Sequence, residues 1–226
     1  MKRLIFDEDH DMFRDATRRF MQAEVEPHVE RWRANGICDK EAFLKAGEQG
    51  LLGMWVPEEY GGMGIEDFRF EQILMEETLR HGDLGLFLTL HSRLVGPYID
   101  RLGSEALKKR LLPKVVSGEC ILGIAMTEPG AGSDLAGIKS RAVRDGADWL
   151  ISGSKTYISN GINGGAFVTA ARTDPDNRHG IGLFVIEEGM EGFQRGRNLA
   201  KMGLKSQDTA ELFFDNVRVP ADNVLG

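Results

Sequence analysis

The sequence has few cysteines and no long hydrophobic run. Its two cysteines, Cys38 and Cys120, are too few for a disulfide framework and lack the spacing of a metal site. This usage fits a reducing, intracellular compartment, and we expect the cytoplasm. No segment approaches the roughly 18 apolar residues that a membrane helix requires. The start of the chain has basic residues but soon turns acidic, which is not a signal peptide. We therefore expect neither a metal nor a membrane span.

Basic residues are also in deficit. The chain has 28 Lys and Arg against 35 Asp and Glu, a formal net charge of −7, which does not favour binding to nucleic acid. An anionic ligand would therefore need a local basic patch. One candidate is a basic run with no acidic residue before Asp208, made of Arg195, Arg197, Lys201 and Lys205. The same run is explained as well by a solvated surface strand and loop.

The first half of the chain is predicted to be helical, and no internal repeat or low-complexity segment interrupts it. From residue 7 to residue 35, apolar residues recur at spacings of three and four: Phe13, Ala16, Phe20 and Ala23. Pro27 is expected to bend this helix or to open a second one. Further helices are expected over residues 66–80, over the mostly apolar residues 84–99 and after the capping residue Ser104. His91, in the most apolar of these, is either a packed core histidine or part of a substrate pocket.

After Gly118 the hydrophobic period changes from about 3.6 to 2. Candidate strands cover residues 140–144, 149–152, 156–159, 166–173, 181–187, 210–214 and 217–219, and tight turns separate them. Short strands joined in this way predict an antiparallel barrel or sandwich. The fold class is therefore α+β, with helices first and strands second and a boundary near residues 117–120.

Between the two halves lies a turn rich in glycine, residues 123–137. Gly130, Gly132 and Gly137 are expected to allow positive φ or the close approach of another molecule. Thr127 and Ser133 add short polar side chains, so the loop suits an anion or a flat polar ring. A tight structural turn is the alternative. The loop is not a Rossmann fingerprint, because the third glycine and the following helix are missing.

Two later segments share this character. Residues 153–161 place Tyr157 beside Thr156 and Ser159 at the end of a strand, which by itself is also ordinary for an edge strand. Residues 202–226 close the chain with a further strand-rich stretch. In this order and at these separations, the three segments point to one family.

The chain resembles the acyl-CoA dehydrogenase flavoprotein family over its whole length. The resemblance rests on Thr127-Glu-Pro-Gly-Ala-Gly-Ser-Asp134, on Asp208-Thr…Val-Arg-Val-Pro220 and on Gly50-Leu-Leu-Gly…Val-Pro-Glu-Glu-Tyr-Gly-Gly. Within the family it is most similar to the bacterial medium- to long-chain type. The resemblance implies an N-terminal α-helical domain over residues 1–119, then a β-domain over 120–226 that contacts flavin and CoA.

The resemblance also implies an activity and its partners. These are α,β-dehydrogenation of an acyl-CoA with FAD as cofactor, an electron-transfer flavoprotein or similar acceptor, and a homo-oligomer, either dimer or tetramer. Matched position by position, the flavin contacts are Ile124, Ala125, Met126, Thr127, Gly130, Gly132, Ser133, Tyr157, Ile158 and Ser159. Ser133 also contacts CoA, and the Ser159 hydroxyl is directed at the flavin N5. Tyr157 and Ser159 stand where many members have Trp and Thr, which keeps an aromatic face and a hydroxyl.

The catalytic base is not assigned in this sequence. Members of the family continue into a second helical bundle that carries the catalytic glutamate, and this bundle would begin where the chain stops, at Gly226. Glu128 is expected to have a structural, hydrogen-bonding role. Two alternatives to a dehydrogenase fragment remain: a flavin oxidase or monooxygenase of the same fold acting on a non-CoA substrate, and a non-catalytic binding or assembly protein if the gene ends at residue 226.

Overall fold

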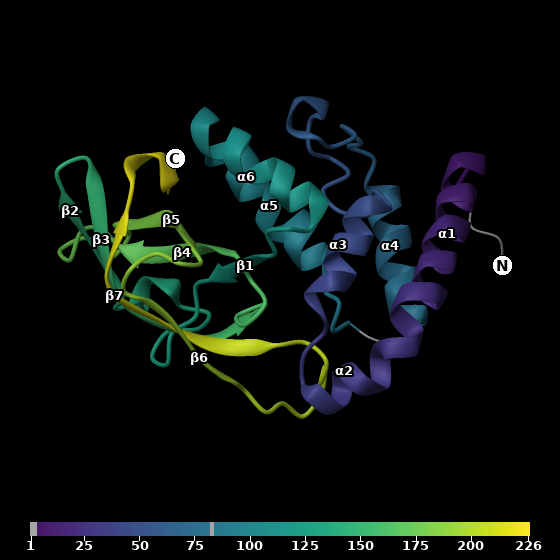
Figure 1. The fold of residues 1–226 in the computed structure, drawn as a ribbon. Helices are drawn as coiled ribbons and strands as arrows, with labels where there is room; N and C mark the ends of the chain where they lie inside the picture. Colours follow the sequence, from purple (N-terminus) through teal and green to yellow (C-terminus); the bar gives the residue numbers. More distant parts are fainter. Residues whose placement is uncertain (1–3, 82–83) are drawn as a thin grey trace.

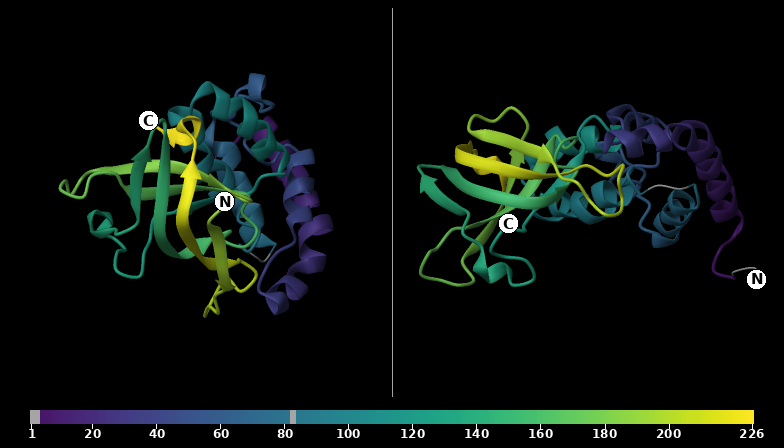
Figure 2. Two further views of the ribbon diagram at one scale, coloured as in Figure 1. Left: turned by 60° about the vertical axis from the view of Figure 1, so that its left-hand side comes forward. Right: turned by 90° about the horizontal axis from the view of Figure 1, so that it is seen from below.

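The computed structural model describes residues 4–81 and 84–226. Helices occupy one end of the molecule and strands the other, with α1 farthest from the sheet (Figure 1). The view from below in Figure 2 shows the same separation. The predicted order of helices before strands is therefore confirmed.

The helical half contains ten helical segments in the described residues. They are α1 (Glu8–Phe20), the π-helical turn η1 (Met21–Val25), the 3-10 turn η2 (Glu26–His28), α2 (Val29–Asn35), α3 (Lys40–Glu48), the 3-10 turn η3 (Glu58–Tyr60), α4 (Phe68–Arg80), the π-helical turn η4 (Leu90–Val95), α5 (Gly96–Leu102) and α6 (Glu105–Ser117). Pro27 was expected to bend the helix or to open a second one. It lies in η2, between the π-helical turn η1 and the separate helix α2, so the helix type changes there.

The predicted inner face of the first helix is partly wrong. Phe20 is buried, but Ala16 and Ala23 are exposed. Thr17 is buried instead, where α1 packs against α4. The π-helical turn that follows changes the number of residues per turn and brings Met21 inward.

The predicted central helix, residues 84–99, is partly wrong. Residues 84–87 are not helical, and the helix begins at Leu88 and continues through η4 and α5. The predicted start of α6 is confirmed, because Ser104 Oγ accepts a hydrogen bond of 3.1 Å from the N–H of Leu107. Gly118 ends α6 in the left-handed conformation, with φ of 81°.

The strand-rich half forms a sheet of eight strands. They are β1 (Leu122–Ala125), β2 (Arg141–Asp145), β3 (Asp148–Ser159), β4 (Ala166–Arg172), β5 (Ile181–Glu187), β6 (Phe193–Asn198), β7 (Thr209–Val219) and β8 (Val224–Leu225). Their order is β6-β7-β3-β2-β4-β5-β8, with β1 paired to β4. The 3-10 turns η5 (Leu135–Gly137) and η6 (Ala221–Asn223) lie in the connections.

The sheet differs from the prediction in three ways. Strands β1, β6 and β8 were not predicted. Most pairs are antiparallel, as expected, but β1 and β2 run parallel to β4. The chain between β1 and β4 is long enough for the crossover that a parallel pair needs. In addition, the predicted strands 149–152 and 156–159 are one strand, β3, as are 210–214 and 217–219 in β7. Register shifts between β3 and β7 mark β-bulges, which bend a strand without ending it.

The two halves share a core at their junction. One hydrophobic cluster contains Leu111 of α6, Val168 of β4 and Val185 of β5. Beside it, the N–H of Leu122 donates to His91 Nδ1 at 2.9 Å, and His91 Nε2 lies 2.9 Å from the carbonyl oxygen of Val115. Nδ1 therefore accepts, and Nε2 carries the proton of a neutral ring. Burial lowers the pKa of His91 to about 4. The prediction of a packed core histidine is confirmed.

Candidate functional site

The structure brings two of the motif segments together. The N–H of Thr156 in β3 donates to the carbonyl oxygen of Thr127 at 2.9 Å. The neighbouring Lys155 places its Nζ 3.1 Å from the carbonyl oxygen of Met126. Residues 126–133 and 155–159, separated in the sequence by β2 and a hairpin, therefore form one unit.

Glu128 fixes this unit from inside. Its side chain, 6% exposed, accepts hydrogen bonds from the N–H of Lys139 (2.6 Å), the N–H of Ser140 (2.9 Å) and Lys155 Nζ (2.8 Å). Burial would raise the pKa of Glu128, but these donors outweigh it and hold the pKa below its usual value. Glu128 therefore has the structural role that the sequence predicted.

The turn that follows Glu128 presents unused donors. Glu128 and Ala131 exchange backbone hydrogen bonds of 2.9 and 3.1 Å. The N–H groups of Gly130, Gly132 and Ser133 have no hydrogen-bond partner within residues 4–81 and 84–226. All three residues are exposed, and a Cβ placed on Gly130 or Gly132 would meet nothing within 4 Å. The loop therefore leaves three N–H groups accessible to a ligand.

The predicted use of glycine in this loop is correct only in part. Gly130, Gly132 and Gly137 do not have positive φ. The bridge between Glu128 and Ala131 closes the turn with φ values that any residue can adopt. The glycines instead leave the backbone uncovered, which was the second half of the expectation.

The other expected contact residues differ in how they face the loop. Ala125 and Ile158 belong to the core of the β-domain, where they are 0% and 2% exposed, so neither is open to a ligand in this structure. Ile124, Met126 and Thr127 are half-buried. These three can present side-chain atoms.

Tyr157 stands out of the sheet. It lies between Lys155 and Ile158, where the pairing of β3 with β7 shifts register, and its φ is 59°. A non-glycine residue in this region is strained by roughly 1–2 kcal/mol. Its side chain is 70% exposed. Ser159, two residues on, is half-buried, and its hydroxyl has no hydrogen-bond partner in the described part of the chain. Such strain is often found at functional sites.

Asp208 holds the far end of this segment. Its carbonyl oxygen accepts from the N–H of Asn160 at 3.1 Å. Its Oδ2 accepts from the N–H of Ile162 at 2.7 Å and that of Asn163 at 3.1 Å. Burial raises the pKa of Asp208. In the sequence, Asp208 stands within a quoted motif and Lys155 lies within residues 153–161, but neither was given a role. The ion pair could have been suspected from the sequence, because the segment 153–161 contains a lysine and was grouped with the loop that contains Glu128.

The predicted basic run does not form a single free patch. Arg195 donates to the carbonyl oxygen of Gly161 at 3.1 Å and pairs with Glu188 at 2.9 Å. Lys201 donates to the carbonyl oxygen of Gln207. These two side chains therefore serve the fold. A positive potential that attracts a phosphate group stays a prediction.

A separate apolar groove of about 370 Å³ lies between α4 and η4. It is lined by Phe68, Glu71, Met75, Phe87, Thr89, Leu90, Arg93 and Leu94. Glu71 is 4% exposed, and neither carboxylate oxygen has a hydrogen-bond partner among the residues that the structure describes. Burial raises the pKa of Glu71 to about 7, although Arg93 opposes the shift.

Neither a membrane span nor a metal centre stands out in the described residues. None of the helices formed by residues 4–81 and 84–226 has the length and apolar character needed to cross a bilayer. Within the same ranges, His, Cys, Asp and Glu side chains do not gather in groups of three or more that could hold a metal ion. Cys38 and Cys120 are both buried free thiols.

Family comparisons match both halves of the chain. The model described as "Acyl-CoA dehydrogenase, N-terminal domain" matches residues 7–119. The model described as "Acyl-CoA dehydrogenase, middle domain" matches residues 123–217. The two matches follow the helical and the strand-rich halves.

Individual relatives agree. The chain is 47% identical over 227 residues to the mitochondrial long-chain specific acyl-CoA dehydrogenase of Sus scrofa, covering 99% of this chain and 53% of that protein. An acyl-CoA dehydrogenase from Geobacillus kaustophilus matches with a TM-score of 0.95 and 46% identity, over 100% of this chain and 60% of that one.

A glutaryl-CoA dehydrogenase from Mycobacterium smegmatis, in complex with FADH2, matches with a TM-score of 0.89 and 32% identity, over 97% of this chain and 56% of that one. The chain spans about half the length of the curated relatives it matches. Two family models, sequence identity and backbone geometry thus agree over nearly every described residue: the chain belongs to the acyl-CoA dehydrogenase family.

Proposed function

We propose that this chain forms the flavin- and CoA-contacting part of an FAD-dependent acyl-CoA dehydrogenase. The observation that carries the proposal is the joined unit of residues 126–133 and 155–159. It presents unpaired backbone donors beside an exposed aromatic ring. Membership of the family supports the same conclusion.

The residues present fit a flavin. The N–H groups of Gly130, Gly132 and Ser133 can donate to a flat ring with polar edges, and no side chain covers them. Tyr157 offers an aromatic face, and Ser159 a hydroxyl without a partner in the described chain. When bound, FAD would accept the hydride that leaves the substrate.

Each expected contact residue has a role in this proposal. The N–H groups of the glycine-rich loop hold the ring edge, together with Thr127. Ile124 and Met126 line the ring, and the buried Ala125 and Ile158 form the layer behind them. Tyr157 shields it from water, the Ser159 hydroxyl donates toward N5, and Ser133 also contacts CoA.

The base that removes the α-proton lies outside this chain in our proposal. General-base catalysis needs a carboxylate free to reach its proton. Of the two carboxylates in the loop, Glu128 is occupied by three donors and Asp134 is paired with Arg178 at 2.8 Å. The relatives are almost twice as long as this chain, which leaves room for a further domain that carries the base.

The electron acceptor and the assembly are also proposals. We infer an electron-transfer flavoprotein or a similar acceptor, a homo-oligomeric enzyme and a cytoplasmic location. The two buried free thiols are compatible with a reducing compartment.

Flavin spectroscopy tests the proposal. The purified full-length protein should carry FAD, and acyl-CoAs of graded chain length should bleach its absorbance. The 226-residue chain alone should bind FAD weakly and should not dehydrogenate any acyl-CoA. Full-length protein that never takes up flavin would overturn the proposed function. Turnover by the 226-residue chain would show that the base lies within it.

Replacing one hydroxyl tests the predicted contact to N5. Ser159→Ala in the full-length enzyme removes a single uncharged hydrogen bond, which contributes about 0.5–1.5 kcal/mol. Flavin reduction should therefore be slowed only modestly, with the fold intact. A reduction rate and a potential identical to the parent would remove Ser159 from the site.

A further inference from the structure

Lys155 is a charged side chain in the interior of the β-domain. It lies in β3 and is 1% exposed. Burying an ammonium group is costly unless it is paired and hydrogen-bonded. Lys155 Nζ meets two acceptors, Glu128 Oε1 at 2.8 Å and the carbonyl oxygen of Met126 at 3.1 Å. Both belong to the segment that enters the glycine-rich loop.

Glu128 carries this contact across the loop. Its oxygens also accept from the N–H groups of Lys139 and Ser140, which lie where the loop returns to the sheet. The Lys155–Glu128 pair therefore holds both ends of residues 127–138. The unused N–H groups of Gly130, Gly132 and Ser133 lie between these two anchored ends.

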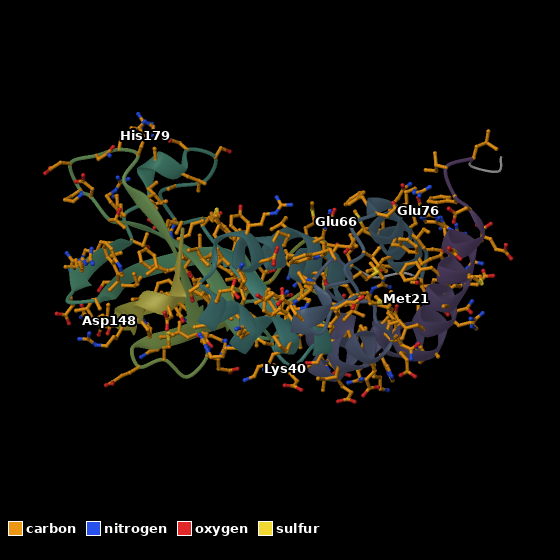
Figure 3. All side chains as sticks on the ribbon, turned by 90° about the horizontal axis from the view of Figure 1, so that it is seen from above. Met21, Lys40, Glu66, Glu76, Asp148 and His179 are labelled. Atoms are coloured by element: carbon orange, nitrogen blue, oxygen red, sulfur yellow. The ribbon has the colours of Figure 1, made fainter. Side chains whose placement is uncertain are left out.

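A second ion pair holds the same loop from outside and serves as a comparison. Asp134 Oδ2 lies 2.8 Å from Arg178, and the two side chains are 66% and 67% exposed. His179, the neighbour of Arg178, lies at the outer edge of the β-domain in Figure 3. An exposed pair of this kind contributes about 0–1 kcal/mol. The buried pair, by contrast, has fixed geometry and additional hydrogen bonds.

We propose that Lys155 is a positioning residue of the flavin site. With Glu128 it fixes residues 127–133, so that the N–H groups of Gly130, Gly132 and Ser133 are already in place when flavin arrives. Donors that need no ordering on binding give tighter binding, because no conformational entropy is lost at that moment. This inference rests on the proposed function.

Four variants of the full-length protein test it. Lys155→Met keeps an unbranched side chain without the charge. The double variant Lys155→Met/Glu128→Gln leaves no buried charge unpaired, so it should recover stability. It should not recover the order of the loop. The two carboxylate oxygens of Glu128 each accept from one N–H group, that of Lys139 or Ser140, whereas a glutamine amide has only one oxygen. Arg178→Met is the matched control at the exposed pair.

Two readouts separate positioning from general stability. In flavin-free protein, hydrogen exchange at the N–H groups of Ala131 and Thr156 reports the order of the loop, because their backbone acceptors remain in every variant. Exchange should be at least about tenfold faster in Lys155→Met and in the double variant than in Arg178→Met. The dissociation constant of FAD should rise by at least about tenfold in both, a loss of about 1.4 kcal/mol. Lys155→Arg, which keeps the charge, should restore most of the affinity.

The outcomes distinguish this proposal from the proposed function. Exchange in both Lys155 variants equal to that in Arg178→Met would overturn the positioning role. Flavin affinity that returns fully with stability in the double variant would also overturn it. If the parent takes up no flavin, the proposed function fails, and the exchange comparison still decides whether Lys155 orders the loop.

Discussion

The helical domain and the β-domain each bury a carboxylate beside a candidate ligand surface, and they treat it in opposite ways. Glu128 receives three hydrogen bonds, one of them from a buried lysine, and its pKa is lowered. Glu71 receives none from the described residues, and burial raises its pKa to about 7. A buried carboxylate by itself therefore does not mark a site. The hydrogen-bond donors around the carboxylate decide its effect. With donors it stays charged and orders a loop, and without them burial destabilises its charged form.

The backbone around each residue explains the difference. Glu128 sits in a turn, and the N–H groups of Lys139 and Ser140 are free to reach it. Glu71 lies within α4, where neighbouring N–H groups are used by the helix itself. Arg93 is the cation that lowers the pKa of Glu71 against burial, and its guanidinium lies over the ring of Phe68, 5.6 Å from the ring centroid.

The largest expected effect on stability comes from removing the carboxylate of Glu128. Glu128→Ala leaves Lys155 buried without an anionic partner and leaves two N–H groups without acceptors. The free energy of unfolding should fall by about 3–5 kcal/mol, measured by urea denaturation near neutral pH. Asp134→Ala removes the exposed carboxylate of the same loop and should change stability by less than about 1 kcal/mol. Equal losses in the two variants would mean that burial adds nothing to this ion pair.

Replacing Glu71 should increase the stability of the protein, whereas replacing Glu128 decreases it. The pKa of Glu71 is raised from 4.5 to about 7, so the folded state binds the proton more tightly than the unfolded chain. The stability that this proton provides is present below about pH 4.5 and is lost as the pH rises through 7. Glu71→Gln should therefore stabilise the protein by about 3 kcal/mol near pH 8 and by little near pH 5. A gain that does not depend on pH would show that Glu71 is not protonated in this range.

The titration of His91, at the junction of the two domains, should change stability with pH in the direction opposite to that of Glu71, over an overlapping range of pH. Its folded pKa is about 4 against an ordinary 6.5, so its contribution is full above 6.5 and is lost as the pH falls through 4. The loss amounts to about 3 kcal/mol and should become visible in the Glu71→Gln variant. NMR titration of the imidazole, with the proton on Nε2 at neutral pH, checks the assignment. A midpoint near 6.5 would contradict it.

Periodicity predicted most elements, but not the features that bend or join them. The strand over residues 181–187 is observed with the same bounds, because turn residues flank a nearly continuous apolar run on both sides. The π-helical turn at residues 21–25 and the bulges of β3 leave no trace in hydrophobic spacing, since they arise when elements pack against each other. This is why Ala23 was placed inward and β3 was divided.

The candidate site shows the same limit. Its segments were found from their glycines, hydroxyls and the resemblance, all of which are visible in the sequence. The contact between Lys155 and Glu128 spans 27 positions and depends on the register of β3 beside the loop. The positive φ of Tyr157 likewise follows from a bulge and not from the residue, because tyrosine has no preference for that conformation.

The smallest expected effect concerns that strained residue. Tyr157 is 70% exposed, so shortening its side chain removes little packing, and its φ of 59° strains any residue with a Cβ. Tyr157→Gly relieves roughly 1–2 kcal/mol of strain, while the freer unfolded chain offsets about 0.4–1 kcal/mol of this gain. The protein should therefore become more stable by less than about 1.5 kcal/mol, whereas Tyr157→Ala, which keeps the strain, should not gain.

Tyr157→Gly and Tyr157→Ala in the Lys155→Met background test whether the buried ion pair enforces the strain at position 157. Strain persists only where the surrounding structure enforces it. If the Lys155–Glu128 pair enforces the bulge, the difference between glycine and alanine at position 157 should shrink once Lys155 is replaced, because the segment can then relax. Urea denaturation of the four variants measures this coupling as a double-mutant cycle. An unchanged difference would assign the strain to the pairing of β3 with β7 and not to the ion pair.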